Sequence, residues 1–173
     1  MFTFHATPYD ITASGFYFKD YDDYKKNYDL HLPVEEYEIQ FIDGPSDYGQ
    51  KVLDNFPLEQ AIEMLETQEE LDIAKVCYVL DMGIQLGNDP TDAVRYAQDN
   101  IIIIGNRWPN ATMCSEKELV ADSVLEEFFP DIANMLEERN LDSYFDTERF
   151  IEHSTDGNIE KFNDEWCYVE VMR

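Results

Sequence analysis

Residues 116–152 have the sequence EKELVADSVLEEFFPDIANMLEERNLDSYFDTERFIE, in which acidic side chains far outnumber basic ones. Only Lys117, Arg139 and Arg149 are basic. Twelve positions are acidic: Glu116, Glu118, Asp122, Glu126, Glu127, Asp131, Glu137, Glu138, Asp142, Asp146, Glu148 and Glu152. This part of the chain therefore carries carboxylates with few cations to pair them.

The first part of this segment has the pattern of a two-sided helix. At about 100° per residue, one arc of such a helix is apolar and consists of Val120, Ala121, Val124, Leu125 and Phe128. The opposite arc consists of Glu116, Glu118, Asp122, Glu126 and Glu127. The segment Ser115-Glu116-Lys117-Glu118 is an S-x-x-E capping box that predicts where the helix begins, and Pro130 predicts its end. A solvated outer face is the simplest interpretation of one such helix, so a functional interpretation needs the pattern to recur.

The composition indicates a folded protein. The chain has 173 residues, enough for one domain or two to three small modules with a sizeable core. Its hydrophobic fraction is 44%, and it contains 11 Phe and 11 Tyr. Disordered acidic chains are poor in aromatic residues. We therefore expect packed modules beneath the charge.

The net charge is −26, from 12 basic and 38 acidic residues, and it is spread through the chain. Residues 1–60 carry −8, residues 61–100 carry −7 and residues 101–173 carry −11. The same number of charges occupies about 44 Å of duplex DNA, and a compact chain of this length is about 40 Å across. Direct binding to nucleic acid is thereby excluded. Such self-repulsion suggests adaptation to high salt, cation buffering or a basic partner.

The patterns predict an α+β fold built as an elongated chain of small modules. We expect an α/β module at 1–56, a helical module at 57–100 and a second α/β module at 101–173. Alternation and apolar runs predict strands at 2–6, 35–43, 101–104 and 165–172, and a new element of unassigned type begins at 16–18. Helical periodicity predicts helices at 20–28, 68–86 and 89–98, one opening at Pro57, one from 116 to Pro130, and shorter pieces at 132–136 and 147–153.

The sequence contains no pattern of an enzyme or a metal site. The three histidines, His5, His31 and His153, lie in different contexts without ligand spacing. The cysteines Cys77, Cys114 and Cys167 are far apart, which is typical of a reducing cytoplasm. The acidic runs at 20–23 and 43–47 lack a complete calcium-binding loop. We predict no catalytic residues, no cofactor and no metal.

The N-terminus lacks the pattern of a signal peptide, and no apolar run is long enough for a membrane span. The predicted location is the cytoplasm of a host cell.

Acidic rows recur along the predicted helices and strands. Carboxylates spaced by three and four residues on a helix lie about 5–6 Å apart, close to the spacing of phosphates along a DNA strand. We therefore predict a partner-binding surface made of Glu36, Glu38, Glu59, Glu63, Glu66, Glu70, Glu116, Glu118, Asp122, Glu126, Glu127, Asp131, Glu137, Glu138, Asp146 and Glu148. A protein that grips DNA with a Lys/Arg groove would be attracted to such a surface.

Other functions fit the same composition. One alternative is an inhibitor of another DNA-binding defence system, such as a CRISPR effector, because that target also presents a basic groove. Another is an acidic protein of a high-salt cell, or a cation-binding protein. A halophilic protein would unfold at low salt, whereas a DNA mimic would stay folded.

Several short segments resemble the ArdA antirestriction family. Residues 140–150 (NLDSYFDTERF), the turn 156–158 (DGN) and the strand 165–171 (EWCYVEV) are similar to the C-terminal module of that family. Residues 35–43 (EEYEIQFID) resemble a strand of its first module. The chain departs from the family pattern at 152–154, where Arg-Asp-Leu is usual, and in lacking the asparagine-rich N-terminal signature.

The resemblance implies a function as well as a fold. ArdA-like proteins are elongated, curved homodimers that mimic bent duplex DNA. The likeness implies that this chain occupies the DNA-binding groove of type I restriction-modification enzymes, on the methyltransferase core. It would thereby act as a counter-defence inhibitor that protects incoming phage or mobile-element DNA.

Overall fold

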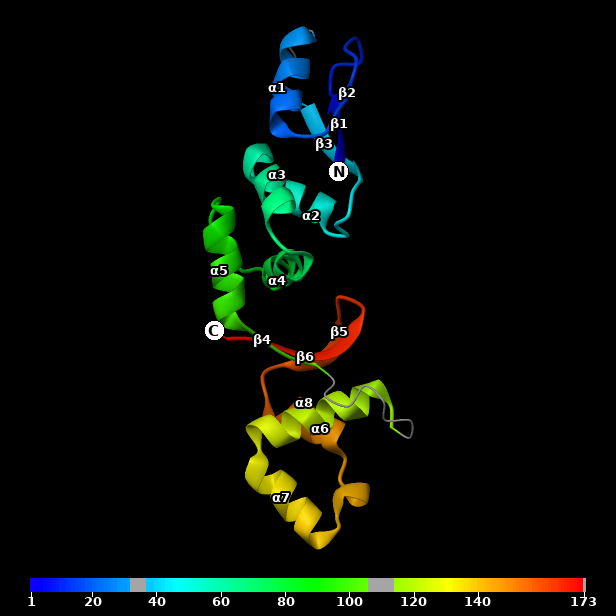
Figure 1. Cartoon of the computed structure of the whole chain (residues 1–173), viewed down its shortest axis with the longest axis vertical. Coiled ribbons are helices and arrows are strands. Elements are labelled where there is room, and N and C mark those ends of the chain that lie inside the picture. The colour runs from blue at the N-terminus through cyan, green and yellow to red at the C-terminus, as the bar shows by residue number, and fades with distance from the viewer. Residues whose placement is uncertain (32–36, 106–113, 173) are drawn as a thin grey trace. The chain divides into compact units, whose positions relative to one another are not determined.

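The computed structural model describes residues 1–31, 37–105 and 114–172, and its fold is of the predicted α+β class. The chain divides into two compact units, residues 1–98 and 99–173. Each unit contains its own three-stranded antiparallel sheet, and the elements can be followed in Figure 1. The first unit includes both the predicted α/β module and nearly all of the predicted helical one, so the three-module division stays a prediction.

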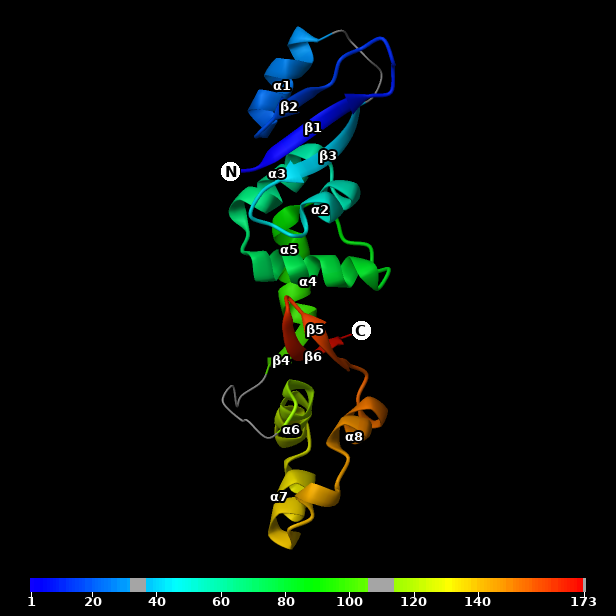
Figure 2. The same ribbon diagram turned by 90° about the vertical axis from the view of Figure 1, so that its right-hand side faces the viewer.

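The sheet of the first unit is built around aromatic residues. Its strands β1 (Thr3–Pro8), β2 (Phe16–Phe18) and β3 (Tyr37–Asp43) have the order β2-β1-β3, as Figure 2 shows. The central Phe4 is fully buried and pairs in register with Phe18 on β2 and Phe41 on β3. Helix α1 (Tyr21–Leu30) begins at Asp20, whose carboxylate accepts the backbone N–H of Asp23. Its Tyr24 ring lies 5.0 Å from that of Phe18, so aromatic contacts join α1 to the sheet.

Four helices complete the first unit: α2 (Gly49–Asn55), α3 (Leu58–Thr67), α4 (Glu70–Asp81) and α5 (Pro90–Asn100). The helix predicted at 68–86 is wrong at its C-terminal end. Gly83 has φ 77°, its N–H bonds the Leu80 carbonyl, and the Ile84 N–H bonds the Val79 carbonyl. This is a Schellman motif, and it ends α4 because only the left-handed backbone allows both hydrogen bonds. Helix α2 was not predicted, since seven residues show too little periodicity.

The second unit has strands β4 (Ile101–Gly105), β5 (Asn158–Phe162) and β6 (Glu165–Val171) in the order β4-β6-β5. The predicted strands at 101–104 and 165–172 are confirmed, but β5 was missed. It forms a hairpin with β6 through Asn163 and Asp164, both with positive φ (52° and 65°). Two such residues make a type I′ turn, which favours Asn and Asp.

The helices of the second unit cover a small apolar core. They are α6 (Glu116–Phe128), α7 (Pro130–Arg139) and α8 (Thr147–Ser154), with a 3₁₀ turn, η1 (Asp142–Tyr144), before α8. The fully buried Val120, Val124, Ile151 and Tyr168 form the centre of the core. Pro130 ends α6 as predicted and also opens α7, where proline is suited to the first turn. Asn140, at φ 53°, ends α7, so this helix is longer than the predicted 132–136.

Phe128 is less buried than its place on the apolar arc of α6 predicts. It is 37% exposed, and its ring packs edge-on against the Tyr168 ring, with the two ring centroids 5.7 Å apart.

Among the described residues, every helix is too short or too polar to cross a membrane.

Gly157 provides a test of the packing around Tyr168. A Cβ at this buried glycine would overlap the Tyr168 ring, whereas Gly87 has open space around it. We expect Gly157→Ala to lower the free energy of unfolding by about 1–3 kcal/mol through overpacking. Urea titration followed by circular dichroism, which reports on both units, measures it, with Gly87→Ala as the matched control. Equal stability of the two variants would contradict this packing.

Candidate acidic interaction surfaces

Helix α3 presents three glutamates on its outer face. Glu59, Glu63 and Glu66 are exposed, while the inward-facing Ala61, Ile62, Met64 and Leu65 are buried. At a rise of about 1.5 Å per residue, these three charges follow one another at intervals of about 5 Å. Measured along the axis of the duplex, one strand of DNA carries a charge about every 3.4 Å. The α3 row alone is thus more dilute than a DNA strand, so mimicry would need several rows.

Glu70 does not continue this row, which corrects the prediction. Helix α3 ends at Thr67 and Glu70 opens α4. The Glu70 Oε1 accepts hydrogen bonds from Ser46 Oγ at 3.2 Å and from the Asp47 backbone N–H at 3.0 Å. Glu70 therefore ties α4 to the segment before α2.

The predicted strand row is described in part. Glu38 is exposed on β3, where the period-two pattern places it. Glu36 lies outside the described residues.

Four of the six lysine and arginine residues of the first unit form ion pairs with aspartates, and none of these described pairs involves a glutamate of α3. The ion pairs are Lys25–Asp22 at 2.9 Å, Lys75–Asp72 at 3.9 Å, Arg95–Asp92 at 2.8 Å and Lys51–Asp81. Three of these are pairs at i, i+3 on one helix. Within the described residues, Glu59, Glu63 and Glu66 take part in no ion pair. The hydrogen bond to Asp22 and, less strongly, the charge of Glu59 raise the pKa of Lys25, so Glu59 acts on a nearby cation, whereas the charges of Glu63 and Glu66 are left to solvent or to a partner.

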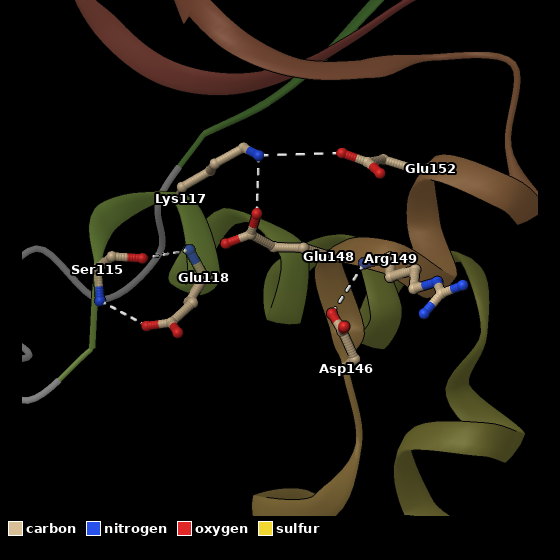
Figure 3. A network of polar contacts seen from close by, with 7 residues as sticks. All are labelled: Ser115, Lys117, Glu118, Asp146, Glu148, Arg149 and Glu152. Atoms are coloured by element: carbon tan, nitrogen blue, oxygen red, sulfur yellow. Dashed lines mark hydrogen bonds and ion pairs between the residues drawn. The ribbon is translucent and has the colours of Figure 1, made fainter.

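In the second unit, three of the predicted acids hold the ends of α6 and α8 (Figure 3). Ser115 and Glu118 form the predicted capping box: the Glu118 carboxylate accepts the Ser115 N–H at 2.7 Å, and the Ser115 hydroxyl accepts the Glu118 N–H at 3.1 Å. Asp146 caps α8 by accepting the Arg149 N–H at 3.1 Å. Glu148 pairs with Lys117, at 2.7 Å, across the two helices. Glu118, Asp146 and Glu148 therefore stabilise the fold.

The remaining predicted acids of this unit are exposed on α6 and α7. They are Glu116, Glu126, Glu127, Asp131, Glu137 and Glu138. Two of them, Glu126 and Glu137, border a cavity of about 640 Å³ with an apolar floor that includes Leu119, Leu125 and Leu136. This cavity brings together residues from α6, α7 and the segment before α8.

Asp122 points to the same cavity but is only half exposed. Burial raises the pKa of its carboxyl group, and the negative charges of Glu118 and Asp142 raise it further. A hydrogen bond from Thr147 acts in the opposite direction and lowers the pKa. The ionised form of Asp122 is thus disfavoured by the fold, so this residue is a weaker candidate for a partner contact than its exposed neighbours.

Asp122→Asn tests this electrostatic penalty. Because the folded pKa lies above the usual value of 3.8 for an aspartate, the wild-type penalty is fully present above the folded pKa and absent below about pH 3.8. We expect the variant to unfold with a higher free energy at pH 7, by less than about 1 kcal/mol because the site is half exposed to solvent. The gain should vanish at acid pH. Urea unfolding across this pH range measures it.

The control for Asp122→Asn is Asp131→Asn, which removes the same charge from an exposed position on α7. If both variants gained equally at neutral pH, the effect would come from net charge rather than from burial of Asp122.

The described residues also include two histidines with local hydrogen bonds and a buried cysteine. They contain no group of three or more His, Cys, Asp or Glu that could hold a metal ion. His5 bonds Thr7 at 2.9 Å, and His31 bonds the Asn27 carbonyl at 2.6 Å. Cys77 is buried in the core, and burial raises the pKa of its thiol to about 12.

Comparison with known proteins adds no family to these observations. No protein-family model matches the chain, and neither a curated protein nor a solved structure matches it.

The sequence prediction also missed one feature, an open groove lined by tyrosines in the first unit. Its signal was the spacing of Tyr21, Tyr24 and Tyr28 on α1, which puts their side chains on one helix face.

Proposed function

We propose that this protein is a DNA-mimicking inhibitor that binds the basic groove of a DNA-binding defence enzyme. The observation that carries the proposal is that only some of its acidic residues are paired with cations. Aspartates pair with four of the six lysine and arginine residues of the first unit, whereas Glu59, Glu63 and Glu66 stay exposed outside the described ion pairs. The exposed glutamates of α6 and α7 offer a second anionic surface.

The protein would inhibit by occupying the DNA-binding groove and would catalyse no reaction. Carboxylates fixed on folded helices present negative charge with part of its ordering cost already met before binding. A groove of Lys and Arg that attracts duplex DNA would attract this surface through the same long-range field. The inhibitor would prevent the enzyme from holding its substrate while remaining unchanged itself.

The resemblance to the ArdA family supports a particular target. It favours the methyltransferase core of type I restriction-modification enzymes, and a homodimer as the inhibiting form. The protected molecule would then be incoming phage or mobile-element DNA.

A triple substitution on α3 tests the proposal. In Glu59→Gln/Glu63→Gln/Glu66→Gln, three negative charges are lost from the net charge of −26 while the buried face is kept. We expect the inhibition constant against a type I methyltransferase core to rise about threefold to a hundredfold, at about 0.2–1 kcal/mol for each exposed ion pair lost. Inhibition of DNA binding, measured by gel shift at several salt concentrations, gives the value.

The matched control removes three exposed charges from separate elements, as Asp43→Asn/Asp99→Asn/Glu165→Gln. Because both variants have the same net charge, a difference between them reports the α3 row. Identical potency of the two triple variants would remove the row from the proposed interface. A wild-type protein that leaves DNA binding by the enzyme unaffected even at low salt would overturn the proposed target.

A further inference from the structure

The tyrosine groove of the first unit lies among α1, β3 and the start of α3. It is an open hollow of about 630 Å³ whose lining includes Tyr21, Tyr24, Tyr28, Tyr37, Lys25 and Asp29. All of these residues belong to one compact unit, so the groove is formed within that unit. Four phenol rings and two charged side chains face the same space.

The four rings form a continuous run. The centroids of Tyr21 and Tyr24 lie 6.1 Å apart with nearly parallel planes (11°), and those of Tyr24 and Tyr28 lie 5.9 Å apart. Tyr28 meets Tyr37 edge-on at 5.7 Å. Each ring has a negative face and a positive edge, so exposed faces in such a run attract cations.

One cation already uses this property. The Lys25 ammonium lies 4.6 Å from the centroid of the Tyr21 ring, and it also pairs with Asp22 at 2.9 Å. Lys25 is about half exposed, with a side-chain accessibility of 53%, so it can move away from the ring. A cation from outside would therefore compete with Lys25 for the Tyr21 face.

The groove lining also includes a hydroxyl group whose hydrogen bonds are unsatisfied. Among the described residues, the buried phenolic oxygen of Tyr37 has no hydrogen-bond partner. A buried polar atom of this kind is normally satisfied by a protein group, a water molecule or a ligand. The carboxylate of Asp29 also borders the groove and can accept hydrogen bonds.

We infer that this groove binds the guanidinium group of an arginine supplied by the protein's partner. Guanidinium is planar, stacks on aromatic faces and is less strongly hydrated than ammonium, so it suits a tyrosine run better than lysine does. Its N–H donors can reach both an aromatic hydroxyl and a carboxylate. The first unit has 6 basic and 20 acidic residues, so its field also favours a cationic occupant. The identity of the partner rests on the proposed function, but arginine recognition does not.

Peptide binding tests the groove without any enzyme. Fluorescence anisotropy with labelled tetra-arginine and tetra-lysine peptides compares two probes of equal charge on the full-length protein. We expect tetra-arginine to bind several-fold more tightly. Tyr37→Phe should remove most of that preference while leaving tetra-lysine binding unchanged. It should not lower the thermal stability, because it removes an unsatisfied polar group from a buried site.

Two lysine variants test whether removing the lysine that lies over the Tyr21 ring strengthens peptide binding. Lys25→Ala frees the Tyr21 face, whereas Lys26→Ala makes the same charge change at an exposed position that does not line the groove. We expect Lys25→Ala to tighten tetra-arginine binding about two- to fivefold relative to Lys26→Ala, the range of a cation–π contact at an exposed site.

Equal affinity of the wild-type protein for the two peptides would overturn the inference, and so would equal affinities of the two lysine variants for tetra-arginine. Either result would leave the α3 row and the proposed inhibition untouched. Conversely, arginine preference in a protein that inhibits no DNA-binding enzyme would keep the groove and remove the proposed target.

Discussion

Repulsion among carboxylates is the constraint to which the rest of the molecule responds. A net charge of −26 on 173 residues opposes any compact state, so each unit has to offset it by packing and by local pairing. The first unit does so with rings around Phe4 and with buried aliphatic side chains on α3 and α4. The second does so with a core around Tyr168 and Ile151. In both units the charge is carried by the outer faces of elements whose inner faces are mainly apolar.

The way the few cations are used follows from the same constraint. Lys117 joins α6 to α8 through Glu148, and Lys51 joins α2 to α4 through Asp81. Each of these two lysines neutralises a carboxylate where two helices meet. Glu118 and Asp146 are neutralised differently, by backbone N–H groups at helix N-termini, where the helix dipole favours negative charge. The exposed glutamates of α3, Glu59, Glu63 and Glu66, are among the acids that a basic partner could use.

Sequence patterns predicted the parts of the fold that have long periodic signals. The capping box at Ser115 predicted the start of α6, and alternation predicted β3 and β6. Shorter signals failed. Helix α2 is too short for periodicity to show, and β5 was missed because the turn residues Asn163 and Asp164 were not recognised. The predicted helix at 68–86 extends beyond the end of α4, because Gly83 carries a left-handed backbone that periodicity does not show.

The candidate surface was predictable in composition but not in role. Sequence spacing finds Glu59, Glu63 and Glu66 on one face, yet it cannot show that Glu70 binds the Ser46 hydroxyl, that Glu148 pairs with Lys117, or that Asp122 is half buried. These roles depend on contacts between residues distant in the chain. The tyrosine groove is similar, since the spacing on α1 places three rings together but the fourth comes from β3.

The most direct measurement is competition between this protein and duplex DNA for one enzyme. A type I methyltransferase core is saturated with labelled duplex and titrated with the protein, and the complexes are separated by native electrophoresis or mass photometry. Mimicry predicts that the duplex is displaced in full, and that the protein concentration needed rises in proportion to the DNA present. A stable complex that contains the enzyme, the duplex and this protein together would contradict it.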